Sequence, residues 1–207
     1  MMGSRVGSGR TRFRRIGSVG LMLVVGGASI LLSTRGVAQV AAQKGSGMNP
    51  KIVQQKAFPV IGIAVRTNNA REMTAEGVIG KQWARFMQEG LLGKIPNRAD
   101  ENIVALITDY ASDKDGDYTQ VIGARVTKAD QVPAGMVAKQ VPAGKYAVFA
   151  SEKGPVAQVV VGTWQKIWAT PKTAPGGDRT YKTDFEVYDQ RARDPQATVM
   201  DVYVGIK

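Results

Sequence analysis

Apolar and polar positions along this chain follow two patterns that occur in the same order twice. Short runs rich in β-branched residues alternate with longer stretches in which apolar residues recur every three or four positions. These spacings are typical of strands and of amphipathic helices, respectively. The first half predicts strands over 58–70, 102–110 and 118–126 and a helix over 75–95. The second half predicts strands over 141–154, 181–189 and 197–207 and a helix over 155–170.

Both halves therefore have the order strand, helix, strand, strand. Matching residues recur at nearly constant offsets, in the pairs Pro59 and Pro142, Trp83 and Trp164, Asp109 and Asp189, and Gly123 and Gly205. We predict an α+β fold in which two tandem β-α-β-β units form an eight-stranded antiparallel sheet with two helices on one face. Because sheets twist, the other face is expected to curve into a ligand groove between the two units.

The strand 182–189, with the sequence KTDFEVYD, places a carboxylate next to a phenol. Side chains alternate across a strand, so Phe185 and Val187 share one face and Glu186 and Tyr188 share the other. We expect the helices to cover Phe185 and Val187, which leaves Glu186 and Tyr188 in the groove. The corresponding residues of the first half are Leu106 and Thr108, and Tyr110 continues the same face. The groove would then be charged from one side only.

Several stretches of the second half resemble a known family. They are GKYAVF (144–149) closed by Gly154, the pair Trp164 and Trp168, DFEVY (184–188) and the closing strand MDVYVGIK (200–207). Together they resemble the GyrI-like small-molecule-binding domain, the effector-binding module of many AraC-type and MerR-type regulators, over roughly residues 55–207. The resemblance implies a groove for lipophilic, often cationic molecules, in which Glu186 supplies the negative charge. Gly205 departs from the family pattern, because a proline is common there.

Aromatic side chains provide the remaining candidates for the groove. Tyr146 and Tyr203 lie on predicted strands, and Trp83, Trp164 and Trp168 lie on predicted helices. Each has a structural alternative, because large aromatic residues on these elements often pack in a core. Around a carboxylate they would attract an organic cation through electrostatic and cation–π interactions.

The chain contains neither cysteine nor histidine. This composition excludes thiol nucleophiles, disulfides, histidine-based triads and zinc-finger sites. It also disfavours the haem-binding branch of the same superfold. The loop 113–117, DKDGD, has the start of a calcium loop, but the position of the closing glutamate falls near Arg125, so we expect a hairpin turn. We expect no metal and no cofactor.

Residues 1–42 have the layout of an export signal. An arginine-rich start precedes the uncharged apolar stretch 16–33 and a segment rich in small residues, which is the pattern of a secretory signal peptide. Cleavage after Ala38 or Ala42 would release the protein into the periplasm or the medium, and a Sec-type signal fits better than a twin-arginine signal. Alternatively, 16–33 remains as an uncleaved membrane anchor. Residues 43–54 are predicted to be a flexible linker before a domain at 55–207.

The net charge of +11 does not by itself indicate a nucleic-acid partner. Residues 1–43 hold six of the 28 basic residues and none of the 17 acidic ones, and the other basic residues are scattered. No DNA-binding domain precedes the predicted module, so we expect no nucleic-acid partner.

The function we expect is an exported protein that holds a lipophilic, cationic or aromatic small molecule at Glu186. A less favoured alternative is a hydrolase of reactive small molecules, with Glu186 as general base and a tyrosine as hydrogen-bond donor. A third possibility is a non-catalytic protein-interaction module whose groove is filled by its own side chains.

Overall fold

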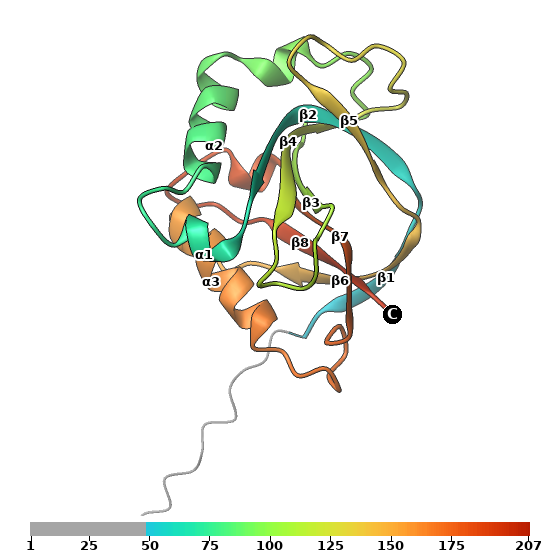
Figure 1. Cartoon of the computed structure of the whole chain (residues 1–207), viewed down its shortest axis with the longest axis vertical. Helices are drawn as coiled ribbons and strands as arrows, with labels where there is room; N and C mark the ends of the chain where they lie inside the picture. Colours follow the sequence, from blue (N-terminus) through green and yellow to red (C-terminus); the bar gives the residue numbers. More distant parts are fainter. Residues whose placement is uncertain (1–48) are drawn as a thin grey trace, which may run out of the picture. The chain divides into compact units, whose positions relative to one another are not determined.

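An antiparallel sheet of eight strands with two longer helices on one side makes up the computed structural model, which describes residues 49–207 (Figure 1). The strands are β1 (Lys51–Gln55), β2 (Phe58–Thr67), β3 (Ile103–Thr108), β4 (Tyr118–Arg125), β5 (Val137–Val141), β6 (Gly144–Ala150), β7 (Arg179–Tyr188) and β8 (Asp201–Ile206). The helices are α1 (Asn69–Glu72), α2 (Ile79–Gln88) and α3 (Val156–Trp168), with short 3-10 turns η1 (Leu91–Lys94) and η2 (Gln190–Ala192).

The order of strands across the sheet is β1-β6-β8-β7-β3-β4-β2-β5. The three strands of the first predicted unit, β2, β3 and β4, lie together, as do β6, β7 and β8 of the second. The two groups meet at the central pair, where Ala105 of β3 lies opposite Glu186 of β7. The predicted α+β fold with an eight-stranded antiparallel sheet is confirmed.

The two outermost strands, β1 and β5, were not predicted. Residues 51–54 were expected to belong to a linker, but Lys51–Gln55 pairs with β6, and β5 pairs with β2. In the sequence β1 precedes the first group and β5 precedes the second, but each pairs at the outer edge of the other group. Both are five residues long, and most of their side chains are exposed or half-buried. Their apolar pattern is consequently weak, and their place depends on backbone pairing with the neighbouring strand.

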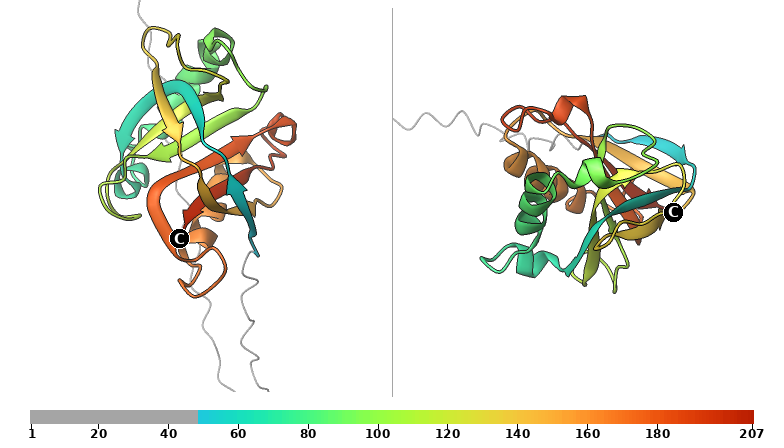
Figure 2. Two further views of the ribbon diagram at one scale, coloured as in Figure 1. Left: turned by 90° about the vertical axis from the view of Figure 1, so that its right-hand side faces the viewer. Right: turned by 90° about the horizontal axis from the view of Figure 1, so that it is seen from above.

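The two faces of the sheet carry different cores. On the helix side, the buried cluster includes Ala105, Ile107, Val202 and Val204 with residues of α2 and α3. On the opposite side, a second cluster contains Phe58, Val60, Val104, Leu106, Val121, Val141, Tyr146 and Phe185. Figure 2 shows the strong twist of the sheet, with the helices on one side of it only. The side without helices is thus occupied by the chain's own side chains.

A close approach of two backbones fixes the pairing of β2 with β4. Gly62 lies opposite Gly123, and a Cβ added at Gly123 would overlap the backbone of Ile61 and Gly62. We expect Gly123→Ala to lower the free energy of unfolding by about 2 kcal/mol or more, because the strands must move apart to accept the methyl group. Urea unfolding followed by circular dichroism measures this. Gly93→Ala is the control, because a Cβ at Gly93 meets no atom within 4 Å. Equal losses in both variants would contradict the argument.

No helix within residues 49–207 is long and apolar enough to cross a membrane. The predicted signal peptide or anchor at 1–42 and the first half of the predicted linker, 43–48, lie outside the described residues.

Candidate functional site

A cavity of about 760 Å³ lies between α2 and α3, above the central strands β3 and β7. Each helix covers one half of the sheet, and the space between them is where the cavity forms. Most of its wall is apolar or aromatic, from Ile79, Trp83, Ala84 and Met87 of α2, Val156, Ala157, Val160, Val161, Trp164 and Trp168 of α3, and Ile103 and Ile107 of β3. Met73, Met87 and Val161 are strongly exposed and form part of the rim. A deep apolar cavity with few polar groups is typical of a small-molecule site.

Glu186 is the polar centre of this cavity. Its side chain is 3% exposed, and each carboxylate oxygen accepts one hydrogen bond. The Trp164 Nε1 donates to Oε1 over 2.6 Å, and the Tyr188 hydroxyl donates to Oε2 over 2.7 Å. Burial raises the pKa of Glu186, and the two hydrogen bonds act in the opposite direction because they stabilise the charged form. Within residues 49–207, no lysine or arginine forms an ion pair with Glu186.

Aromatic rings surround this carboxylate on the helix side. The ring of Tyr188 packs edge-on against that of Trp83, with centroids 5.0 Å apart, and Trp164 lies 6.2 Å from Trp168. These rings come from β7, α2 and α3, so the two halves of the sheet contribute to one wall. Flat aromatic faces beside a carboxylate can hold a cation and also provide apolar contact area.

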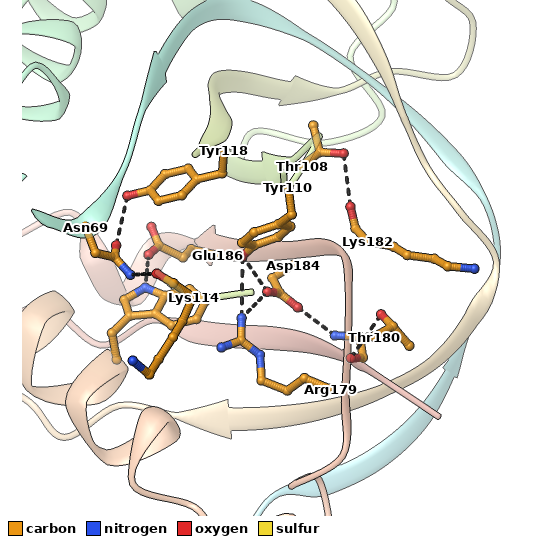
Figure 3. A network of polar contacts seen from close by, with 12 residues as sticks. Asn69, Thr108, Tyr110, Lys114, Tyr118, Arg179, Thr180, Lys182, Asp184 and Glu186 are labelled. Atoms are coloured by element: carbon orange, nitrogen blue, oxygen red, sulfur yellow. Dashed lines mark hydrogen bonds and ion pairs between the residues drawn. The ribbon is translucent and has the colours of Figure 1, made fainter. Parts of the chain in front are cut away.

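A second buried carboxylate, that of Asp184, lies two residues before Glu186 on β7, behind the lining residue Arg179. Asp184 is fully buried, and its Oδ2 accepts hydrogen bonds from the Tyr110 hydroxyl, over 2.6 Å, and from Arg179. Its Oδ1 accepts the backbone N–H of Gly205 over 2.8 Å. Figure 3 shows Tyr110, Asp184 and Arg179 converging there, with Glu186 nearby. The Arg179–Asp184 ion pair leaves Glu186 as the buried carboxylate without a cation in this wall.

Six of the ten residues predicted for the site line the cavity, namely Glu186, Tyr188, Tyr110, Trp83, Trp164 and Trp168. Whether they contact a ligand remains a prediction.

The other four predicted residues lie away from the cavity. Leu106 and Tyr146 are buried in the cluster on the opposite face, Tyr203 packs against it, and the Thr108 hydroxyl contacts Thr183. The prediction that Leu106 shares the face of Glu186 was wrong. Leu106 lies opposite Phe185 and belongs to the cluster on the other face, and Ala105 is the residue of β3 that lies opposite Glu186.

The prediction that the groove lies on the face without helices was also wrong. The alternation along β7 is as expected, but Glu186 and Tyr188 face the helices, and Phe185 faces away from them. Phe185 is in contact with three other aromatic rings, those of Phe58, Tyr146 and Tyr203, at centroid distances of 5.5, 5.4 and 4.4 Å. This aromatic cluster fills the concavity where the groove was expected. The cavity forms instead where the two helices stand apart.

Sequence reasoning missed several residues of the wall. Arg179 lies between the predicted helix 155–170 and the predicted strand 181–189, and Met73 lies between the predicted strand 58–70 and the predicted helix 75–95, so neither fell on an element that the sequence assigned to the site. A possible signal was the pair Asp184 and Glu186, since two carboxylates at positions i and i+2 share a strand face. The groove expected on the face without helices is filled by the chain's own side chains, as the interaction-module alternative expected, but the cavity between α2 and α3 is open.

A curved eight-stranded sheet, two helices and a buried carboxylate in an apolar cavity together define a small-molecule effector-binding domain of the GyrI-like type. The chain belongs to the Cass2 family, described as integron-associated effector binding proteins, whose model matches residues 51–206. The resemblance predicted from the sequence is thus confirmed.

Two curated relatives match most of the domain. YobU of Bacillus subtilis, which carries the name of a transcriptional regulator, is 35% identical over 147 residues, covering 70% of this chain and 90% of YobU. The transcriptional regulator BrlR of Pseudomonas aeruginosa is 32% identical over 177 residues. That match covers 83% of this chain but only 60% of BrlR.

Solved structures show the same fold. An integron cassette protein from the mobile metagenome of Vibrio cholerae has a TM-score of 0.61 at 27% identity, covering 77% of this chain and 96% of that protein. The protein SAV2435, solved bound to tetraphenylphosphonium, has a TM-score of 0.58 at 19% identity, covering 77% of this chain and 94% of SAV2435. At that identity, the second likeness shows the fold alone.

Proposed function

We propose that this protein binds a lipophilic organic cation in the cavity between α2 and α3, with Glu186 as the charge that selects it. The observation that carries the proposal is the burial of the Glu186 carboxylate without a cationic side chain beside it in the described part of the chain. Glu186 is a buried carboxylate with two hydrogen-bond donors but no cationic partner among residues 49–207. An uncompensated buried charge is costly, so a bound cation would relieve that cost.

The surroundings of Glu186 indicate what kind of cation fits. Trp83, Trp164, Trp168 and Tyr188 offer ring faces and edges, and the rest of the wall is mostly aliphatic. A small hydrated ion would gain little from such a wall, whereas a cation surrounded by aromatic groups would gain apolar burial and cation–π contact. The volume of about 760 Å³ is in the range of sites for drug-sized ligands. The tetraphenylphosphonium complex of SAV2435 shows that a protein of this fold can hold such an ion.

The direct test compares two ions of the same shape and opposite charge. Tetraphenylphosphonium is expected to bind one to one with a dissociation constant of micromolar order, from about −0.3 kcal/mol for each of its roughly 25 non-hydrogen atoms. Tetraphenylborate is the matched anion and is expected not to bind, because its charge would lie against Glu186. Isothermal titration calorimetry measures both. Equal affinity for the two ions would show that apolar contact alone drives binding, and would contradict the proposal.

One observation keeps the hydrolase alternative open. The Tyr188 hydroxyl donates to Glu186 over 2.7 Å, which is the pairing of a carboxylate base with an aromatic donor that this alternative requires. Turnover of an electrophilic substrate that is lost in Glu186→Gln would support it, and unchanged substrate would count against it.

Export of the protein is part of the same proposal. It rests on the arginine-rich, apolar and small-residue segments of 1–42, which have the order of a secretory signal. Immunoblotting of cell fractions tests it, since detection of the full-length protein only in the cytosolic fraction would contradict export.

A further inference from the structure

Arg179 occupies an unusual position in the cavity wall. It is only 8% exposed, and its guanidinium lies 4.4 Å from the ring centroid of Tyr181 and 5.6 Å from that of Trp164. Its Nη2 contacts Asp184 and the Tyr110 hydroxyl. Its Nε and Nη1 are covered by neighbouring atoms, and neither has a hydrogen-bond partner among the described residues. A buried guanidinium with two unused donor nitrogens is expensive, and such a group calls for an explanation.

The backbone of β7 is distorted in a way that brings Arg179 to this wall. Arg179 pairs with Ile206 of β8 and Asp184 pairs with Val204, so β7 uses five residues where β8 uses two. In a regular strand, Arg179 and Asp184 would point to opposite faces, because five positions separate them. The irregularity places them on the same side. Bulges of this kind commonly redirect a side chain next to a functional site.

Strain accompanies this irregularity. Tyr181, which lies inside the distorted stretch, has a φ of 51°, in the left-handed region that bulky residues rarely adopt. Neither the strain nor the burial of a partly unpaired guanidinium is expected from a strand selected for stability alone. Strained residues of this kind tend to occur at ligand sites, where the surrounding structure holds them in place.

Trp164 connects Arg179 with the charge centre. Its indole N–H donates to Glu186, while its ring lies near the Arg179 guanidinium. A ligand that lies along Trp164 would therefore meet a carboxylate at one end and the Arg179 guanidinium at the other, where the covered Nε and Nη1 become accessible to an acceptor once neighbouring side chains shift. Four charged residues line the cavity, namely the carboxylates Glu72 and Glu186, the Arg179 guanidinium and the Lys114 ammonium, and Asp184 pairs with Arg179. With all five groups ionised the net charge is −1, which one monovalent cation balances.

We propose that Arg179 forms a second subsite, which binds a neutral hydrogen-bond acceptor such as the carbonyl oxygen of an ester or amide. The preferred ligand is then a lipophilic monocation that also carries an acceptor, with the cation at Glu186 and the acceptor at the unused Arg179 nitrogens. This inference rests on the proposed function, because it extends the same cavity. A charged acceptor such as a carboxylate fits less well, because it would leave the wall and ligand together with an excess negative charge.

The test uses two probes with the same cation and equal chain length. They are heptyltriphenylphosphonium and (4-ethoxy-4-oxobutyl)triphenylphosphonium, which differ by one ester group. The wild-type protein is expected to bind the ester probe more tightly, although the ester is the less lipophilic of the two. Arg179→Lys is expected to weaken ester binding about tenfold and to change heptyl binding less than twofold, because lysine keeps the charge but loses the planar pair of donors.

Two further measurements separate this subsite from a general effect on folding or charge. Arg125→Lys makes the same exchange at an arginine that stacks on Phe58, outside the cavity, and should change neither affinity. Glu186→Gln should weaken the binding of both probes by the same factor and leave the ratio of their affinities unchanged. An unchanged affinity in this variant would contradict the proposed function, whereas the ratio of the two affinities tests the Arg179 subsite. Calorimetry gives all the affinities. The subsite is overturned if wild type binds the ester probe no more tightly than the heptyl probe, or if Arg179→Lys weakens both probes equally.

Discussion

Glu186→Gln is expected to lower the affinity for tetraphenylphosphonium by about 30-fold or more while the protein stays folded. Removing one partner of a buried charge pair typically costs at least 2 kcal/mol of binding free energy, and every 1.4 kcal/mol is a factor of ten. Glutamine has nearly the same shape as glutamate. Its carbonyl oxygen can still accept from Trp164, and the Tyr188 hydroxyl can rotate to accept from the new amide. Calorimetry measures the affinity.

Stability provides the internal control for this variant. Without ligand, the wild-type protein carries a buried carboxylate with no cation in contact, so Glu186→Gln should leave the melting temperature unchanged or raise it. Glu152→Gln is the matched exchange on the surface, where the side chain is 83% exposed, and should alter neither property. Loss of binding together with a large drop in melting temperature would mean that Glu186 has a structural role, and the charge-selection model would then fail.

The second large effect is on pH. Since burial raises the pKa of Glu186, a proton and an organic cation compete for the same carboxylate. We expect the affinity for tetraphenylphosphonium to fall as the pH drops below that pKa, approaching tenfold for each pH unit. The phosphonium charge does not titrate. Tyr188 and Tyr118 stay neutral in this range, because burial raises the pKa of each further above its ordinary value. Titrations from pH 4 to 8 test this, with Glu186→Gln expected to give a flat profile.

The same shift has the opposite sign for the stability of the ligand-free protein. The folded state holds its proton at Glu186 above pH 4.5, the ordinary value, where the unfolded chain releases it. The folded protein then binds more protons than the unfolded chain, so this group lowers stability as pH rises from about 4.5 through the raised pKa. Below the ordinary value both states are protonated, and the cost disappears. A difference between the wild-type and Glu186→Gln stability curves that does not grow over this interval would contradict the raised pKa.

The elements with strong apolar periodicity could be predicted from the sequence, and the edge strands could not. Strands β3, β4 and β7 and helix α3 lie close to their predicted ranges, whereas α2 occupies only the middle of the predicted helix 75–95. The edge strands β1 and β5 bury little, so no periodic pattern marked them. Pattern alone also could not decide which face of β7 meets the helices, since Phe185 on one side and Tyr188 on the other are both large and both buried.

The site was predictable in its chemistry but not in its full composition. Glu186, Tyr188 and the tryptophans were candidates because a carboxylate beside aromatic residues is a typical arrangement for binding an organic cation. Arg179 could not be predicted as a site residue, because only the irregular pairing between β7 and β8 brings its side chain to the face of Asp184. A strict alternation rule assigns it to the opposite side of the sheet.

The exchange of the outer strands ties the two walls of the cavity together. β1 leads directly into β2 but pairs with β6, and β5 leads into β6 but pairs with β2. The edge strand of each half is therefore supplied by the segment that precedes the other half in the sequence. The connections from β1 to β2 and from β5 to β6 link the two halves in addition to the central pair of β3 and β7. Opening that central pair would require both outer pairings to break or stretch at the same time. The binding site thus lies between two halves of the sheet that are held together at both edges. When a ligand enters, this arrangement favours side-chain adjustment along α2 and α3 over separation of the halves.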